Sequence, residues 1–239
     1  MSAHRVGYRR RWQLPSSIKE IIMSTGRRFH SGYRETIRLA DRRPLHIRLI
    51  SPTDRPKLAE AFHHLSAESR YCRFLSHKNA LTSQELKFFT ECDGIDHLAL
   101  GAFEPASAGS RGDGALVGIA RLIRCPDRPT QAEFALAVID ACQGLGLGRL
   151  LLERLRAAAA ELDIHHLEGQ LLPDNQKVRR LLHRSSPAAV FRNDNGLVNV
   201  LLPVLPAPVD GLSQGITRNA RVLTVWPFSS APLRGQIRV

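Results

Sequence analysis

Apolar and polar residues follow two periods along this chain. In short runs they alternate, which predicts half-buried strands, and elsewhere apolar residues recur every three or four positions, which predicts amphipathic helices. Strands are predicted over residues 45–50, 97–103, 115–123, 132–139, 166–172 and 197–202, and helices over 52–65, 68–75, 149–162 and 175–184 and after residue 82. This order predicts a single mixed α/β domain.

Two of the helix starts are marked by capping residues. Ser51 precedes Pro52, a residue favoured at the first helical position, and an acid follows at Asp54. Thr82 and Glu85 have the spacing of a capping box, in which each side chain accepts a backbone hydrogen bond from the other residue. The small residues over 105–114 predict a flexible hairpin loop.

A glycine-rich turn lies between the predicted strand 132–139 and the predicted helix 149–162. Gly144, Gly146 and Gly148 alternate there with other residues. Glycines in front of a helix leave backbone N–H groups open to an anion such as a phosphate, although they also suit a simple tight turn. Arg149 and Leu150 exclude a Walker loop, and too few strand and helix units follow for a dinucleotide fold.

Positive charge is concentrated near the N-terminus. The 239 residues have a formal net charge of +12, and residues 1–43 hold 11 Lys or Arg against 3 Asp or Glu. We expect a basic arm over 1–43 without fixed structure. Its Arg9, Arg10 and Arg11 suit a contact with nucleic acid or an acidic partner, while the simpler interpretation is a solvated tail. Residues 206–239 form a proline-containing tail to which no motif assigns a role.

Composition also limits the compartment and the chemistry. No run of about 18 apolar residues and no secretory core occurs, so we expect a cytoplasmic protein with no membrane contact. The four cysteines form no C-x-x-C pair, which predicts free thiols and no metal site. Asp93, Asp96 and His97 are interpreted as loop-capping groups, because no third metal ligand can be placed beside them.

Four ordered segments carry a family resemblance. They are residues 65–74 (LSAESRYCRF), 93–100 (DGIDHLAL), 132–135 (AEFA) and the turn Gln143-x-x-Gly146-x-Gly148. Together they resemble the GNAT N-acetyltransferase superfamily, in its bacterial protein-lysine-acetyltransferase-like branch, over about residues 45–203. The resemblance implies a mostly antiparallel central sheet flanked by helices, in a domain over 44–205, and acetyl-CoA or another acyl-CoA as cosubstrate.

The resemblance also assigns residues to this cosubstrate. The backbone of the turn would hold the pyrophosphate, through Gln143, Gly144, Leu145, Gly146, Leu147 and Gly148. The end of the preceding strand would hold the pantetheine arm and the thioester carbonyl, through Ala137, Val138 and Ile139. Asn175 matches an asparagine that contacts the coenzyme arm, and its alternative is a plain helix cap.

Glu133 is the candidate general base, because it matches the catalytic glutamate of the AEFA segment; by periodicity alone it would be a solvent-facing acid. A base is needed because a lysine amine, with a pKa near 10.4, is almost wholly protonated at neutral pH. The acceptor side is assigned to one helical segment, through Ser69, Arg70, Tyr71 and Arg73. Their alternative is a core tyrosine beside solvated arginines.

The chain departs from the family near its last helix. Leu182 stands where the family usually has a tyrosine that protonates the leaving thiolate, and Ser186 and Pro187 stand near the place of an expected Gly-Phe pair. The leading hypothesis is still an N-acyltransferase that acts on a protein lysine or a small amine by direct attack. The alternatives are a noncatalytic acyl-CoA sensor whose basic arm contacts a partner and, more weakly, a dinucleotide-binding enzyme.

Overall fold

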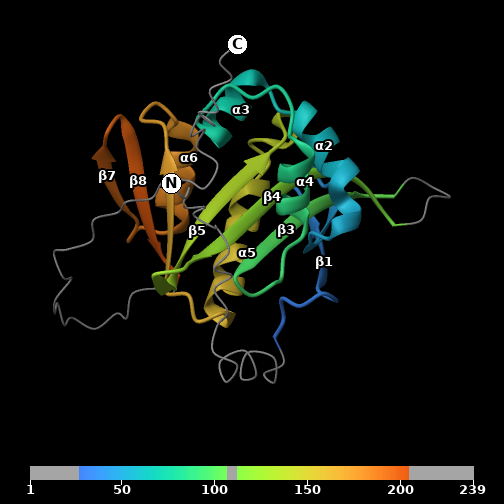
Figure 1. The fold of residues 1–239 in the computed structure, drawn as a ribbon. Helices are drawn as coiled ribbons and strands as arrows, with labels where there is room; N and C mark the ends of the chain where they lie inside the picture. Colours follow the sequence, from blue (N-terminus) through green and yellow to red (C-terminus); the bar gives the residue numbers. More distant parts are fainter. Residues whose placement is uncertain (1–26, 107–111, 205–239) are drawn as a thin grey trace, which may run out of the picture.

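Eight strands form one sheet in the order β1-β2-β3-β4-β5-β6-β8-β7 in the computed structural model, which describes residues 27–106 and 112–204 (Figure 1). Their bounds are β1 Arg34–Arg38, β2 Pro44–Leu49, β3 His97–Pro105, β4 Asp113–Cys125, β5 Arg128–Val138, β6 His166–Leu171, β7 Val190–Asp194 and β8 Leu197–Pro203. Only β5 and β6 pair in parallel; the other neighbours are antiparallel. The mostly antiparallel mixed fold is therefore confirmed.

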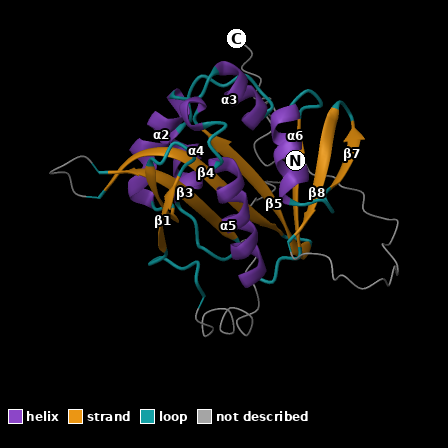
Figure 2. Cartoon of the chain, turned by 180° about the vertical axis from the view of Figure 1, so that it is seen from behind, coloured by secondary structure: helices purple, strands orange, loops and turns teal. Residues whose placement is uncertain are grey.

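Helices cover both faces of the sheet. On one face lie α2 (Arg55–His63), α3 (Ala67–Phe74) and α4 (Ser83–Thr90). In Figure 1, α2 and α4 lie in front of the strands and α3 lies at the top. On the other face lie α5 (Leu147–Glu161) and α6 (Gln176–Ser185), which come to the front when the molecule is seen from behind (Figure 2). The predicted stripe of α5 is confirmed, because its leucines pack into the core beneath the sheet, as Leu151, Leu155 and Leu162.

The predicted caps explain where two helices begin. Thr82 Oγ1 accepts from Glu85 N at 3.2 Å, and Glu85 Oε2 accepts from Thr82 N at 2.8 Å, which completes the capping box of α4. Ser51 is followed first by a 3₁₀ turn over Pro52–Asp54, and the α-helix starts only at Arg55. The helical segment therefore begins after Ser51 as predicted, but its first turn is a 3₁₀ turn and not an α-helical one.

The sheet is larger than the sequence pattern predicted. Residues 27–43, assigned to the basic arm, contain β1, which pairs with β2, and the buried side chains of Phe29 and Tyr33. The arm assignment is corrected there, since Phe29 N donates to Glu161 at 3.1 Å and Glu35 accepts from Arg154 at 2.6 and 2.7 Å, both distant in the sequence. Strand β7 was also missed, because it is an exposed edge strand with a mostly polar sequence. Arg9–Arg11 and the tail over 206–239 lie outside the described residues.

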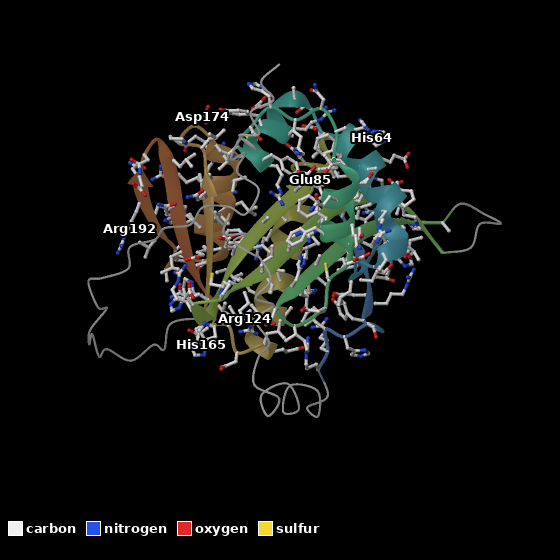
Figure 3. All side chains as sticks on the ribbon, in the orientation of Figure 1. His64, Glu85, Arg124, His165, Asp174 and Arg192 are labelled. Atoms are coloured by element: carbon white, nitrogen blue, oxygen red, sulfur yellow. The ribbon has the colours of Figure 1, made fainter. Side chains whose placement is uncertain are left out.

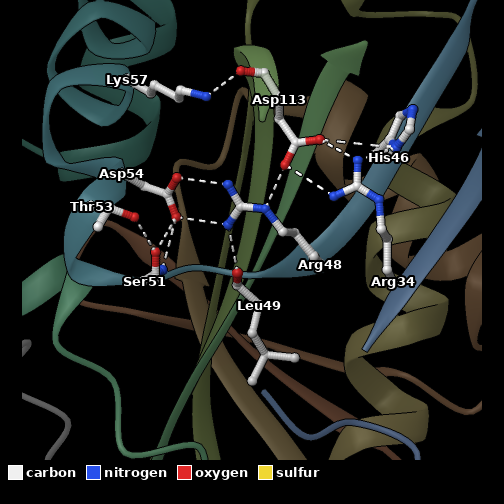
Figure 4. A network of polar contacts seen from close by, with 9 residues as sticks. All are labelled: Arg34, His46, Arg48, Leu49, Ser51, Thr53, Asp54, Lys57 and Asp113. Carbon is white, nitrogen blue, oxygen red and sulfur yellow. Dashed lines mark hydrogen bonds and ion pairs between the residues drawn. The ribbon is translucent and has the colours of Figure 1, made fainter. Parts of the chain in front are cut away.

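A network of charged groups fastens β2 to the helical face and to the start of β4 (Figure 4). The guanidinium of Arg48 donates to both carboxylate oxygens of Asp54, at 2.7 and 2.8 Å, and to Asp113 at 2.7 Å. Arg34 donates to Asp113 as well, at 2.5 Å. Both aspartates have almost fully buried side chains, so these pairs replace the water that each carboxylate loses on folding.

Candidate active site

The sheet opens between β5 and β6. These strands pair over three residues each, Gln131–Glu133 with His166–Glu168, whereas β5 pairs with β4 as far as Val138. Ile139 N donates to Val117 O of β4 at 3.0 Å. Because alternate residues of a strand direct their backbone groups to opposite edges, those of Leu136 and Val138 face the opening. The described structure thus has a slot lined by backbone at the end of β5.

The glycine turn lies at the mouth of this slot. Gly144 and Gly146 have φ angles of +76° and +88°, a backbone conformation that favours glycine. Gly146 is the N-cap of α5 and provides no side-chain hydrogen bond, so the first backbone N–H groups of the helix have no side-chain cap. At Gly148 close packing, and not a positive φ angle, favours glycine, because a Cβ there would lie 3.4 Å from the side chain of Leu181. The turn therefore has the form of an anion-binding helix start.

Asp140 fastens α3 to this turn. Its carboxylate accepts hydrogen bonds from Ser66 N at 2.7 Å and from Ser69 Oγ at 2.8 Å. The side-chain amide of Gln143 donates to Ser69 Oγ at 3.2 Å and to Val138 O at 3.1 Å. Burial works to raise the pKa of Asp140, but these hydrogen bonds outweigh it and hold the pKa below its ordinary value. The strand end, the turn and α3 thus form one hydrogen-bonded unit.

Glu133 lies where β5 and β6 separate. Burial, and next the negative charge of Glu168 on β6, raise the pKa of Glu133 to about 7, while Arg128 acts in the opposite direction. Glu168 itself is buried, with 5% of its surface exposed, and accepts from Arg128 at 2.7 and 2.8 Å and from Cys125 Sγ at 3.1 Å. Glu133 is therefore a half-buried carboxyl group that exchanges a proton near neutral pH.

A cavity of about 50 Å³ lies between the sheet and the helices on the face of α2, α3 and α4. On the sheet side its lining includes Ala135 and Ala137 of β5, and Ile139, which directly follows that strand. Glu133 belongs to the same face of β5, one alternation before Ala135. The candidate base and the cavity thus share one face of the sheet, beside the slot.

The four acceptor-side candidates do not share one location. Ser69 contacts Asp140 and the glutamine of the turn. Arg70 donates to Leu65 O at 2.9 Å, and the ring of Tyr71 lies 4.9 Å from that of His77. Arg73 lines the cavity.

Sequence reasoning missed one cavity residue. Arg121 of β4 lines the cavity opposite Ala135 and has only 3% of its surface exposed. It donates to Phe89 O at 2.7 Å, to Cys92 Sγ and to His97 Nε2. The available signal was a single arginine inside the apolar strand predicted over 115–123.

The family's usual residues on α6 have a structural role here. Asn175 is the N-cap of α6 and accepts from Val178 N at 3.1 Å. Leu182, at the position of the family's tyrosine, is buried in the core, and Ser186 is also buried. Position 182 thus offers no titratable group.

The remaining predicted groups behave as simple structural elements. Asp93 Oδ1 accepts from the backbone N–H of Ile95, Asp96 and His97, each at 2.9 Å, which confirms the loop-capping interpretation for Asp93. The side chain of Asp96 instead pairs with Arg124, and that of His97 contacts Arg121. All four cysteines are free thiols. Within residues 27–106 and 112–204, no group of three or more His, Cys, Asp or Glu side chains could hold a metal, and no helix has the length and apolarity to span a membrane.

Comparisons with known proteins identify relatives of this fold. The model of the acetyltransferase (GNAT) family matches residues 74–185. The chain is similar to Acetyltransferase Pat of Mycolicibacterium smegmatis, with 29% identity over 161 residues, which are 67% of this chain and 46% of that protein. The chain thus spans just under half the length of this curated relative.

Solved structures agree with this match. The crystal structure of the GNAT domain of S. lividans PAT is 26% identical with a TM-score of 0.63, and the match covers 71% of this chain and 96% of that one. The structure of yncA from Salmonella typhimurium, solved with its cofactor acetyl-CoA, is 20% identical with a TM-score of 0.53, covering 70% and 99%. The predicted resemblance and fold class are confirmed.

Proposed function

Because the chain contains a GNAT acetyltransferase domain similar to the protein-lysine-acetyltransferase branch, we propose that it transfers an acetyl or related acyl group from acyl-CoA to a primary amine. The amine belongs to a protein lysine or a small molecule. The observation that carries this proposal is the position of Glu133, at the point where β5 and β6 separate, beside both the slot and the cavity.

The proposed cosubstrate site follows the family pattern on residues of this chain. The turn from Gln143 to Gly148 presents uncapped N–H groups at the positive end of α5, which suits a pyrophosphate. The pantetheine arm would extend along the open edge of β5, past Val138. A relative of the same fold was solved with acetyl-CoA, which supports this assignment. Asn175 would flank the arm from α6 while it caps that helix.

The chemistry requires a proton to leave the amine as the carbon–nitrogen bond forms. The carboxylate of Glu133 accepts this proton, directly or through one water molecule, while the nitrogen attacks the thioester carbonyl. The carbon–sulfur bond then breaks, and the thiol leaves as a thiolate or takes a proton from water. A base with a pKa of about 7 is half ionised at neutral pH and still holds a proton well enough to help the attack.

The developing negative charge on the carbonyl oxygen requires a donor. Ile139 N already donates to Val117 O, so among the three strand-end residues the N–H of Val138, which faces the slot, is the best oriented. Gln143 holds this residue in place by donating to its other backbone group, Val138 O, at 3.1 Å. Val138 is therefore the proposed oxyanion donor.

Titration calorimetry with acetyl-CoA and coenzyme A, followed by a thiol-release assay on a panel of amines, tests the proposal. The Glu133→Gln variant should bind acetyl-CoA as the wild type does and lose about 10²- to 10⁴-fold in turnover. Glu60→Gln, an exposed acid on α2, is the matched control and should change neither quantity. Unchanged turnover in Glu133→Gln would reject this residue as the base.

Leu182 favours one second candidate, the noncatalytic acyl-CoA sensor, because the family's usual thiol-protonating tyrosine is replaced by a buried leucine. A sensor would bind acetyl-CoA without releasing thiol in the presence of any amine. The basic arm, whose triple arginine lies outside the described residues, would then supply the partner contact. Loss of salt-sensitive RNA or DNA retention on deleting residues 1–26 would support that version.

A further inference from the structure

Two arginines line an otherwise apolar cavity. Arg73 reaches it from α3 and Arg121 from β4, and every other residue of its lining is aliphatic, aromatic or glycine. A pocket made only to hold an alkyl chain has no use for two guanidinium groups. Their presence indicates that the natural occupant has a polar, negatively charged end.

Arg121 is buried among neutral acceptors. Its hydrogen-bond partners are the carbonyl of Phe89, the thiol of Cys92 and the imidazole of His97. Burial, and next the positive charge of Arg121, lower the pKa of His97 to about 3, so this ring is neutral. Within the described residues, no ion pair to an Asp or Glu is formed by Arg121.

A second buried arginine of β4 differs from Arg121 in having an acidic partner. Arg124, three residues along β4, is also buried but pairs with the carboxylate of Asp96 at 3.0 Å. Removing a cation from water without an opposite charge is costly. The chain balances Arg124 with its own acid, whereas Arg121 lines the cavity with only neutral hydrogen-bond partners among the described residues.

Arg73 strengthens the positive field at the same place. Burial, followed by repulsion from Arg121, lowers the pKa of Arg73. Two like charges that destabilise each other are both stabilised when an anion lies between them. A guanidinium also matches the two oxygens of a carboxylate.

The strand register relates this anion site to the candidate base. Ile123 lies opposite Glu133, and Arg121 lies opposite Ala135, so Arg121 and Glu133 are diagonal neighbours on one face of the sheet. Such neighbours have backbones about 7–8 Å apart. A molecule that places its amine at Glu133 and an anion at Arg121 therefore has only a few bonds between the two groups.

We propose that the acceptor presents a carboxylate close to its amine nitrogen, at the spacing of Glu133 and Arg121, and that Arg73 and Arg121 bind this carboxylate. The inference rests on the proposed acyl transfer, because it assigns the cavity to the acceptor. Its carboxylate belongs either to a small amino acid-like amine or to an acidic side chain close to a substrate lysine. The size of the cavity, about 50 Å³, suits a carboxylate-sized group in both cases.

The experiment compares acceptors that differ only in this charge. Thiol release with acetyl-CoA is measured for ω-amino acids of two to six carbons and for their neutral amides, and for short peptides in which Glu or Gln neighbours a lysine. The acid should exceed its amide in kcat/KM by about 10- to 100-fold at one chain length. The peptide pair shows whether an acidic side chain serves as well as a free acid.

Charge variants locate the effect. Arg73→Gln and Arg121→Met should each reduce the preference for the acid toward 1, with acetyl-CoA affinity unchanged. The matched control is Arg192→Met, because Arg192 is an exposed cation on β7, away from the cavity (Figure 3), and its loss should leave the preference intact. Arg73 is only partly buried, so its variant remains informative if Arg121→Met fails to fold.

The outcomes separate this inference from the proposed function. If the wild type acetylates amides as well as acids, or if the preference survives Arg73→Gln, the carboxylate site is refuted while the transferase stands. If no amine releases thiol, the transferase fails, and calorimetry of each acid and amide with the coenzyme A complex then decides the site. Equal binding of acid and amide, or equal binding by wild type and Arg73→Gln, would refute it.

Discussion

Substituting Glu168 by glutamine should move the acid side of the pH–rate profile. Glu168 faces Glu133 across the short parallel contact of β5 and β6, and its charge is the second cause of the raised pKa of Glu133. Two unit charges about 5 Å apart interact by about 3 kcal/mol at an effective dielectric constant of about 20. Arg128 and the solvent reduce this repulsion, and we take about 1 kcal/mol as the remainder.

The size of the effect follows from the raised pKa. With a pKa of about 7, Glu133 has about one ionised group for ten neutral ones at pH 6. Removing about 1 kcal/mol of repulsion raises this ratio about fivefold, so the rate at pH 6 relative to the plateau rises about fourfold. The sign is fixed: losing a neighbouring negative charge stabilises the ionised form and shifts the active range to lower pH.

The assay is kcat/KM by thiol release between pH 5.5 and 9, expressed as the ratio of variant to wild type. In this ratio the ionisation of the amine substrate cancels. Cys125→Ala is the control, because Cys125 Sγ also contacts Glu168 but its removal leaves both carboxylates in place. A ratio that is flat with pH for Glu168→Gln, or equally sloped for Cys125→Ala, would refute the reasoning.

Two further predictions concern the coenzyme loop and the fold. Asp140→Ala, which releases α3 from the glycine turn, should weaken acetyl-CoA binding about tenfold by calorimetry. Asp174→Ala, a substitution at an exposed site (Figure 3), is the control and should leave this affinity unchanged. Equal effects of the two substitutions would contradict the role of the Asp140 hydrogen bonds in shaping the turn. Arg48→Met should lower the free energy of unfolding by about 3 kcal/mol in urea at pH 7. Burial raises the pKa of Asp54 and Asp113, but hydrogen bonds from Arg48 to Asp54, and from Arg34 and Arg48 to Asp113, outweigh it and hold both pKa values below the ordinary value. The stabilisation from these carboxylates is therefore complete above about pH 4 and lost as the pH falls further. The difference between wild type and variant should therefore shrink at pH 3, and a constant difference would contradict this explanation.

Local signals were enough for much of the fold. The capping box of Thr82 and Glu85 starts α4 as expected, and the periodicity of 149–162 gives α5 with its buried face. These features depend on residues three or four positions apart, which a sequence shows directly. The glycine turn was found in the same way, because positive φ angles favour one residue type.

Features that depend on distant residues were not visible. Strand β1 is held by pairs such as Glu35 with Arg154, 119 positions apart, and its own sequence has one buried residue, Ile37. The pKa of Glu133 depends on Glu168, which only strand pairing brings near. Arg121 could not be recognised as a cavity residue, because its exposure is decided by helices that cover β4 from elsewhere in the chain.

The short contact between β5 and β6 divides the sheet into two parts, here called plates, that are joined by few backbone pairs. The larger plate contains β1 to β5, and the smaller contains β6, β8 and β7, so across the sheet itself only three residue pairs resist a tilt of one against the other. Glu133 is the last residue of β5 in this joint. The pairing of β5 with β6 therefore determines both the width of the slot and the surroundings of the Glu133 carboxyl group. A substitution in β8 that loosens the smaller plate should reduce the reaction rate before it lowers the stability of the larger plate.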